Sequence, residues 1–294
     1  MGKNYGADRF YEDAFTEEYE DTPEERIEAT LRSSDISHYR MKTIKSGNVL
    51  ECEIYPVWNT RNGQRARKAK ESRQAQKNLN DKNAKKRLIR LLNANFTEED
   101  IWATFTYDKK HLPETPQQAQ REMQNYIRRL SYYNKKHGGE PLKFIYVTEY
   151  EDDPEKGKKR VHHHIVTNFR DRDIAEKMWH GGARTQARRL QPDEYGLEGL
   201  ARYISKDPRG TKRYVCSKNL TQPTITVADR KITRKKARTI VENQGDAAAI
   251  FGSIYKGYCF NDIKAYFSEY ASGAYIYVRM WKPPQRRNNN AKRT

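Results

Sequence analysis

Alternating apolar and polar residues mark several stretches of this chain as strands. The stretch MKTIKSGNVLECEIYPVW, from Met41 to Trp58, alternates on both sides of a Ser46-Gly47-Asn48 turn and predicts a hairpin. The stretch IWATFTYD, residues 101–108, alternates in the manner of a half-buried strand. Two further strands, LKFIYVTEYE (142–151) and VHHHIVTNF (161–169), are joined by the polar loop DDPEKGKKR and predict a second hairpin.

Apolar residues at helical spacing predict the helices. One helix is predicted over 115–136, where one face carries Met123, Tyr126, Ile127 and Leu130. A short helix is predicted for the segment DIAEKMW (173–179). A third is predicted over 192–208, with a buried stripe made of Leu197, Leu200, Ala201 and Ile204. A basic helical stretch over 61–93 ends in Leu88, Leu91 and Leu92, which can dock on a core. This order predicts an α+β fold, an antiparallel sheet flanked by helices, with a basic helical N-terminal extension.

The charge of the chain points to a polyanionic partner. Its 294 residues carry a net charge of +18, a third of them are charged, and 35% are hydrophobic. Lysine and arginine that neutralise phosphates release counterions, so such an excess favours nucleic acid. The three cysteines form no CxxC pair, which argues against a zinc ribbon. No apolar run approaches the ~20 residues that span a bilayer, and the start has no hydrophobic signal core. We expect a cytoplasmic protein without a membrane partner.

Basic residues are densest in the stretch from Arg61 to Asn93. It holds twelve lysines and arginines against Glu71 and Asp81, a net charge of +10. Charge runs are usually solvated helix faces, but this density favours contact with the DNA backbone without base specificity. The residues expected to bind DNA are Arg65, Arg67, Lys68, Lys85, Lys86, Arg87 and Arg90.

Composition divides the chain into four segments. Residues 1–40 are expected to be a disordered tail, because the first thirty carry ten acids against three bases. A second interpretation is that this tail mimics nucleic acid and competes for the basic surface. Residues 41–94 form the hairpin and the basic extension, residues 95–282 form the main domain, and residues 283–294 form a basic disordered tail.

Three consecutive histidines, His162 to His164, predict a metal site. Alternate side chains of a strand share a face, so His162 and His164 point one way and His163 points the other. A hairpin turn centred between 155 and 156 places Glu149 opposite His162, and a register shift would exchange it for Glu151. Nitrogen and oxygen ligands without thiolate suit Mg²⁺ or Mn²⁺, although imidazoles also suit zinc. Isolated histidines are usually structural, but this triplet comes from only seven in the chain.

The predicted helix over 192–208 supplies a candidate nucleophile. Tyr203 and Lys206 lie one turn apart, beside the buried stripe of the helix. A phenol has a pKa near 10 and needs a nearby cation or metal to attack a phosphodiester. Lys206 can lower that pKa or hold the phosphate. In a chain with twenty tyrosines the pair also arises by chance, as an ordinary amphipathic surface pair.

Taken in order, IWATFTYD, KRVHHHIV and LARYISK resemble the three motifs of rolling-circle replication initiators of the HUH (His-hydrophobic-His) endonuclease superfamily. The resemblance covers about 95–282 and is closest to initiators of small single-stranded DNA phages and Gram-positive plasmids. It implies an RRM-like core, metal ligands at Glu149, His162 and His164, a catalytic Tyr203 and a helper Lys206. His163 departs from the pattern, because that position is normally hydrophobic.

Motif order and missing motifs refine what the resemblance implies. Conjugative relaxases have the tyrosine before the histidines, whereas Tyr203 follows them, and Tyr195 is off the helical face that a second catalytic tyrosine would need. The sequence has no GxxxxGK[ST] phosphate loop, so unwinding requires a separate helicase. Tyr107, Tyr150 and Trp179 are either core residues or platforms on which exposed bases stack.

The sequence therefore predicts a metal-dependent, site-specific endonuclease and ligase that initiates rolling-circle replication. It would bind an origin as single-stranded or hairpin DNA and form a 5′-phosphotyrosine intermediate. Two alternatives stay open. One is a transposase or recombinase of the same superfamily, and the other is a non-catalytic DNA-binding protein whose histidines hold a structural metal.

Overall fold

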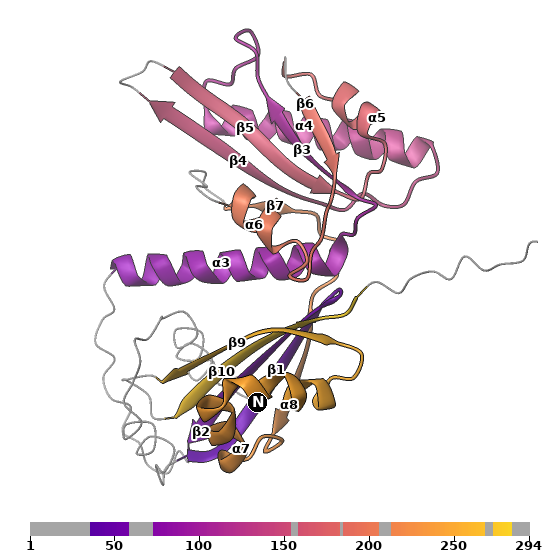
Figure 1. Ribbon diagram of the computed structural model, residues 1–294. Helices are drawn as coiled ribbons and strands as arrows, with labels where there is room; N and C mark the ends of the chain where they lie inside the picture. Colours follow the sequence, from indigo (N-terminus) through magenta and orange to yellow (C-terminus); the bar gives the residue numbers. More distant parts are fainter. Residues whose placement is uncertain are drawn as a thin grey trace, which may run out of the picture. The chain divides into compact units, whose positions relative to one another are not determined.

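The computed structural model describes residues 36–58, 73–153, 158–182, 185–205, 213–267 and 273–283. The chain divides into two compact units, which are described separately below. The central unit comprises residues 84–222, and the terminal unit comprises residues 1–83 with 223–294. Figure 1 shows the helices and strands of both units with the labels used below.

The central unit is built on a five-stranded antiparallel sheet with the strand order β6-β3-β5-β4-β7. Its strands are β3 (Ile101–Thr106), β4 (Phe144–Asp153), β5 (Lys158–Thr167), β6 (Thr185–Arg189) and β7 (Val215–Cys216). Its helices are α4 (Pro116–Lys136), α5 (Arg172–Lys177), α6 (Glu198–Ile204) and the C-terminal part of α3 (Arg73–Asn95). The predicted α+β class, with antiparallel strands flanked by helices, is confirmed.

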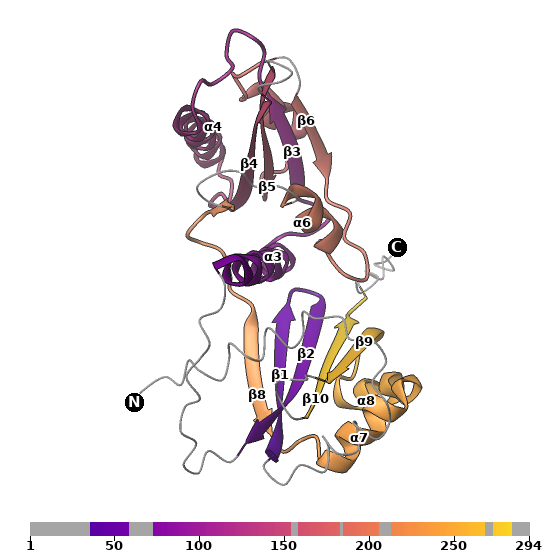
Figure 2. The same cartoon turned by 90° about the vertical axis from the view of Figure 1, so that its left-hand side faces the viewer.

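Helices cover both faces of the central sheet, and each face has its own apolar cluster. On one face α4 contributes Met123, Tyr126 and Leu130, which pack with Phe105 of β3. On the other face α3 and α6 pack against β4 and β5, with Leu88, Leu91, Leu92, Ala201 and Ile204 all at most 1% exposed. Burying each leucine stabilises the fold by roughly 1.5–3 kcal/mol. Figure 2 shows α4 and α6 on opposite sides of the sheet.

The terminal unit contains a second five-stranded antiparallel sheet, with the order β8-β1-β2-β10-β9. Its elements are β1 (Ile36–Ser46), β2 (Val49–Trp58), β8 (Thr224–Asp229), α7 (Arg234–Glu242), the 3₁₀ helix η1 (Gln244–Asp246), α8 (Ala247–Ile254), β9 (Cys259–Phe267) and β10 (Ala274–Trp281). Helices α7 and α8 lie on one face of this sheet in Figure 2, and their apolar residues belong to its core cluster. Gly47 has φ 59° in the β1–β2 turn, so the hairpin predicted there is confirmed.

The terminal unit joins segments that the sequence pattern assigned to different parts of the chain. The strands after Gln222 were grouped with the nuclease segment 95–282, but β10 pairs with β2 and β8 pairs with β1. Strand β1 also begins at Ile36, inside the segment 1–40 that was expected to be a tail. Pairing between strands so distant in sequence leaves no local pattern, because each strand shows only its own alternation.

The helix predicted over 192–208 is much shorter than expected. Helix α6 has seven residues, Glu198–Ile204, and Leu197 is its N-cap. A tight turn precedes it, in which Asp193 and Gly196 pair through their backbones. Gly196 has φ 70°, a left-handed conformation that ends any helix starting at Pro192. The predicted start of the helix at residue 192 was therefore wrong, and Pro192 and Asp193 precede α6.

Candidate active site

The hairpin of β4 and β5 brings a carboxylate and two imidazoles to one face of the central sheet. Glu149 pairs with His162, and Val147 pairs with His164, which is the register expected from the sequence. Directly opposite residues in antiparallel strands share a face, and so do residues two positions apart on one strand. Glu149, His162 and His164 therefore project from the same side of the sheet.

The three side chains are close enough to share one ion. Glu149 Oε2 lies 2.7 Å from His162 Nε2, and Glu149 Oε1 lies 3.9 Å from His164 Nε2. One ligand atom from each residue lies within 4.8 Å of the other two. The side chains of His162 and Glu149 are 28% and 22% exposed, so water and substrate can reach the cluster. Two imidazole nitrogens and a carboxylate form a donor set that fits a divalent metal.

A hydrogen bond from the neighbouring strand orients His164. Its Nδ1 lies 3.0 Å from Thr104 Oγ1 on β3, and its side chain is 3% exposed. Burial lowers the pKa of His164 to about 4, although the Glu149 carboxylate acts in the opposite direction. With Nδ1–H donating to Thr104, the lone pair of Nε2 points to Glu149. This is the usual arrangement of a metal-binding histidine held by a second hydrogen bond.

His163 has a structural role on the opposite face of the sheet. It is fully buried, Nε2 is hydrogen-bonded to Tyr107 Oη at 2.8 Å, and Nδ1 is hydrogen-bonded to Thr148 Oγ1 at 2.8 Å. Burial lowers the pKa of His163 to about 3, so the ring is neutral at physiological pH. In a neutral imidazole one nitrogen donates a hydrogen bond and the other accepts one. A hydroxyl can do either, so Tyr107 and Thr148 can satisfy both ring nitrogens. The prediction that His163 points away from the other two histidines is confirmed.

Helix α6 places Tyr203 beside the histidines. The Tyr203 ring meets the His164 ring edge to face at 5.3 Å between centroids, and it lies 6.0 Å from the Trp102 ring. The helix is anchored by buried Ala201 and Ile204, whereas Tyr203 is 56% exposed. The Tyr203 side chain is thus accessible to a substrate, and its ring lies next to a candidate metal ligand. Lys206, the expected helper, lies outside the described residues.

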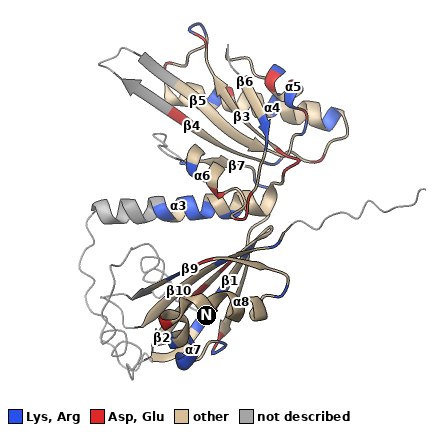
Figure 3. Ribbon diagram, in the orientation of Figure 1, with Lys and Arg blue, Asp and Glu red and all other residues tan. Residues whose placement is uncertain are grey.

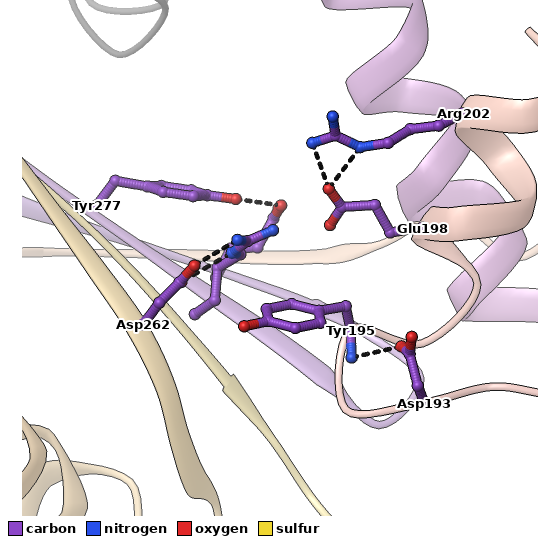
Figure 4. A network of polar contacts seen from close by, with 8 residues as sticks. Asp193, Tyr195, Glu198, Arg202, Asp262 and Tyr277 are labelled. Atoms are coloured by element: carbon purple, nitrogen blue, oxygen red, sulfur yellow. Dashed lines mark hydrogen bonds and ion pairs between the residues drawn. The ribbon is translucent and has the colours of Figure 1, made fainter. Parts of the chain in front are cut away.

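The start of α6 is held by local polar contacts. Asp193 accepts a hydrogen bond from the Tyr195 N–H at 2.8 Å, and Glu198 pairs with Arg202 one turn further along, as Figure 4 shows. The Leu197 N–H donates to Asn93 Oδ1 at 2.7 Å, which ties the beginning of α6 to α3. These contacts fix the helix that carries Tyr203.

A pocket of about 760 Å³ opens next to Tyr203. Residues to which the sequence interpretation gave no binding role form much of its wall, among them Trp102, Arg172, Arg188 and Arg189. The sequence signal for this pocket was weak, because consecutive arginines such as Arg188 and Arg189 in a basic chain are usually solvated surface residues. Their convergence depends on β6 pairing with β3, where Trp102 lies opposite Arg188.

Comparison with known families points to DNA replication. Residues 100–208 match the replication-associated protein ORF2/G2P family. The matched segment lies inside the central unit and contains the metal-ligand cluster together with Tyr203. It covers less than half of the chain. Comparisons with curated proteins and with solved structures gave no match. The match supports a replication initiator, and replication initiators act on DNA.

The residues predicted to bind DNA are only partly among the described residues. Lys85 and Arg87 are exposed on α3, and Lys86 and Arg90 are half-buried there; Figure 3 shows the basic residues along this helix. Arg65, Arg67 and Lys68 lie outside the described residues. Glu151 pairs with Arg160 rather than with a histidine, so the alternative register is not the one observed.

The aromatic residues suggested as stacking platforms belong to the core where they are described. Trp179 is 6% exposed, stacks on Phe105 at 4.8 Å and donates from Nε1 to the Thr106 carbonyl at 2.9 Å. The Tyr107 hydroxyl is hydrogen-bonded to His163. The side chain of Tyr150 lies outside the described residues. In the described part of the chain, no helix has the length and apolar character that a membrane crossing requires.

Proposed function

We propose that this protein is a metal-dependent endonuclease that nicks one DNA strand at a specific site, rejoins strands, and thereby initiates rolling-circle replication. The observation that carries the proposal is the position of Tyr203, exposed and beside the Glu149, His162 and His164 cluster. Support also comes from the family match, which spans these residues.

Tyr203 is the nucleophile in this proposal. Its hydroxyl oxygen attacks the scissile phosphorus, the new O–P bond forms, and the bond from phosphorus to the 3′ oxygen breaks. The phenol proton leaves to solvent, and the departing 3′ oxygen takes up a proton to become a hydroxyl. The 5′ end is then held as a phosphotyrosine ester, which a 3′ hydroxyl can attack to rejoin the strand.

Glu149, His162 and His164 would hold the divalent ion, Mg²⁺ or Mn²⁺. Such an ion withdraws charge from the phosphate oxygens as the phosphorus is attacked. Glu149 supplies the anionic ligand, and the Thr104 hydroxyl keeps Nε2 of His164 directed to the site. Lys206, which follows Tyr203 by three residues in the sequence, is proposed to stabilise the phenolate.

The basic residues of the chain have a separate part in the proposal. Lys85, Lys86, Arg87 and Arg90, with Arg65, Arg67 and Lys68, would contact the backbone of origin DNA in single-stranded or hairpin form. Contacts of this kind position the DNA and do not read its sequence. A separate helicase would unwind the duplex, and the protein would work in the cytoplasm.

A covalent-adduct assay tests the proposal. Labelled single-stranded oligonucleotides that tile the DNA beside the gene are incubated with the full-length protein and Mn²⁺, then separated under denaturing conditions. Wild type should form an adduct on one of them, and Tyr203→Phe should form none. Tyr132→Phe is the matched control, because Tyr132 is 71% exposed on α4, across the sheet.

Three outcomes would overturn parts of the proposal. An unchanged adduct in Tyr203→Phe would exclude Tyr203 as the nucleophile. DNA binding without an adduct on any oligonucleotide would favour a non-catalytic DNA-binding protein. Joining of two ends from an intact double-ended element, with no activity on a lone origin, would favour a transposase.

A further inference from the structure

The pocket beside Tyr203 has a charge that the proposed metal chemistry does not explain. Arg172, Arg188 and Arg189 line it, and Asp193 is the single acid among the described lining residues. The Asp193 carboxylate accepts the Tyr195 N–H, so part of its hydrogen-bonding capacity is already used. The wall therefore carries a net positive charge, which suits an anion.

Two of these arginines are available to a ligand. Arg172 and Arg188 are exposed, and neither pairs with a carboxylate within the part of the chain that the structure describes. Arg189 differs, because it donates to the Glu99 carbonyl. A guanidinium presents several N–H donors in a planar fork that matches the oxygens of a phosphate.

The same wall contains an aromatic platform. Trp102 is half-buried, lines the pocket and contacts Tyr203 edge to face, with 75° between the ring planes. It pairs with Arg188 across β3 and β6, so the indole and the guanidinium project from the same face of the sheet. An aromatic ring next to a basic group is the usual combination for binding single-stranded nucleic acid.

We propose that this pocket binds the nucleotide next to the scissile phosphate, with its base stacked on Trp102 and its phosphate held by Arg188 and Arg172. The inference rests on the proposed nicking function and adds to it a site for the strand. A volume of about 760 Å³ has room for a nucleotide and lies within the range of small-molecule sites, about 300–1,000 Å³. Tyr203 then stands between the bound nucleotide and the metal ligands.

Binding without chemistry tests the phosphate contact. The full-length Tyr203→Phe protein in EDTA is titrated against a labelled single-stranded oligothymidylate, and fluorescence anisotropy reports affinity. Adding Arg188→Ala should weaken binding roughly tenfold, the typical loss for a charge-assisted hydrogen bond. The slope of log affinity against log salt should fall by about 0.7, as for one lost phosphate contact to a single strand. Arg121→Ala, an exposed arginine on α4, is the matched control and should change neither.

A second arm tests stacking from the DNA side, first with the wild-type protein. An abasic site is moved one position at a time along an oligonucleotide that forms the adduct with wild type. One position next to the nick should lower affinity about fivefold or more, because stacking of one base contributes about 1–3 kcal/mol. In Trp102→Leu that position should lose its effect.

The outcomes separate the two proposals. Equal affinities for Arg188→Ala and Arg121→Ala, together with an abasic scan that shows no sensitive position, would overturn the pocket assignment. Normal adduct formation by the Arg188→Ala variant that retains Tyr203, with Mn²⁺ present, would leave the nicking function standing. Competition by thymidine 5′-monophosphate at the concentration where the strand itself binds would also overturn the assignment, because it would indicate a site for free nucleotides. Absence of any adduct would count against the nicking function alone.

Discussion

The rings of Tyr203 and His164 meet edge to face with their centroids 5.3 Å apart, although they come from a helix and a strand far apart in sequence. Because this contact uses the ring and not the hydroxyl, Tyr203→Phe should leave thermal stability within about 0.5 kcal/mol of wild type. Calorimetric unfolding checks this, and the same preparation should fail to form the adduct. A large loss of stability would mean that the hydroxyl has a structural role.

Removing one ligand should weaken metal binding. Glu149→Gln keeps the size of the side chain but removes its charge, and His162→Ala removes one imidazole. Each should lower Mn²⁺ affinity by about tenfold or more in isothermal titration calorimetry, since even indirect support of metal ligands contributes that much. His111→Ala is the control, because His111 lies on the surface beside Asp108. Affinities equal to wild type would contradict the ligand set.

Metal should also stabilise the central unit. An ion that binds the folded state alone, at a hundred times its dissociation constant, raises the free energy of unfolding by about 2.7 kcal/mol. Scanning calorimetry with Mn²⁺ and with EDTA should show this as a higher melting temperature in wild type. The shift should vanish in Glu149→Gln. A shift that persists there would place the ion elsewhere.

His163 should matter for stability through its two hydrogen bonds. His163→Leu fills similar space but leaves the hydroxyls of Tyr107 and Thr148 without their partner. An unsatisfied buried polar group costs about 1–3 kcal/mol, so urea unfolding should show a loss of at least that size. Adding Tyr107→Phe and Thr148→Val should recover part of it, because no hydroxyl is then stranded. A stable His163→Leu single variant would contradict this account.

Gly196 should tolerate no side chain. Its φ is 70°, and a Cβ there would lie 2.4 Å from Asn93 Oδ1, the atom that accepts the Leu197 N–H. Gly196→Ala should therefore destabilise the protein by about 1–3 kcal/mol and reduce adduct formation, because the start of α6 would move. Gly199→Ala is the matched control for stability. A Cβ there meets nothing within 4 Å, and alanine in a helix should be neutral or stabilising by up to about 1 kcal/mol.

Local sequence pattern was sufficient to predict the β4–β5 hairpin, helix α4 and the face on which Glu149, His162 and His164 lie. The alternation of 161–169 separated His163 from its neighbours, and the loop position implied the pairing of Glu149 with His162 that the sheet contains. The helix expected over 115–136 is α4, Pro116–Lys136. These features depend on residues near one another in the chain, where side-chain periodicity and turn position determine which groups meet.

Other features depended on contacts that no local pattern records. The pairing of β2 with β10 creates a second sheet, and the pairing of β3 with β6 places Arg188 beside Trp102. Helix α6 begins at Glu198 and not at Pro192, because Asp193 and Gly196 form a turn before it and Asn93 of α3 accepts the Leu197 N–H. The amino-acid pattern thus specified the histidine face, the hairpin register and the basic charge. The strand order, the arginine pocket and the position of Tyr203 beside His164 arose from packing between distant segments, because those contacts form only when the whole unit buries its apolar faces together.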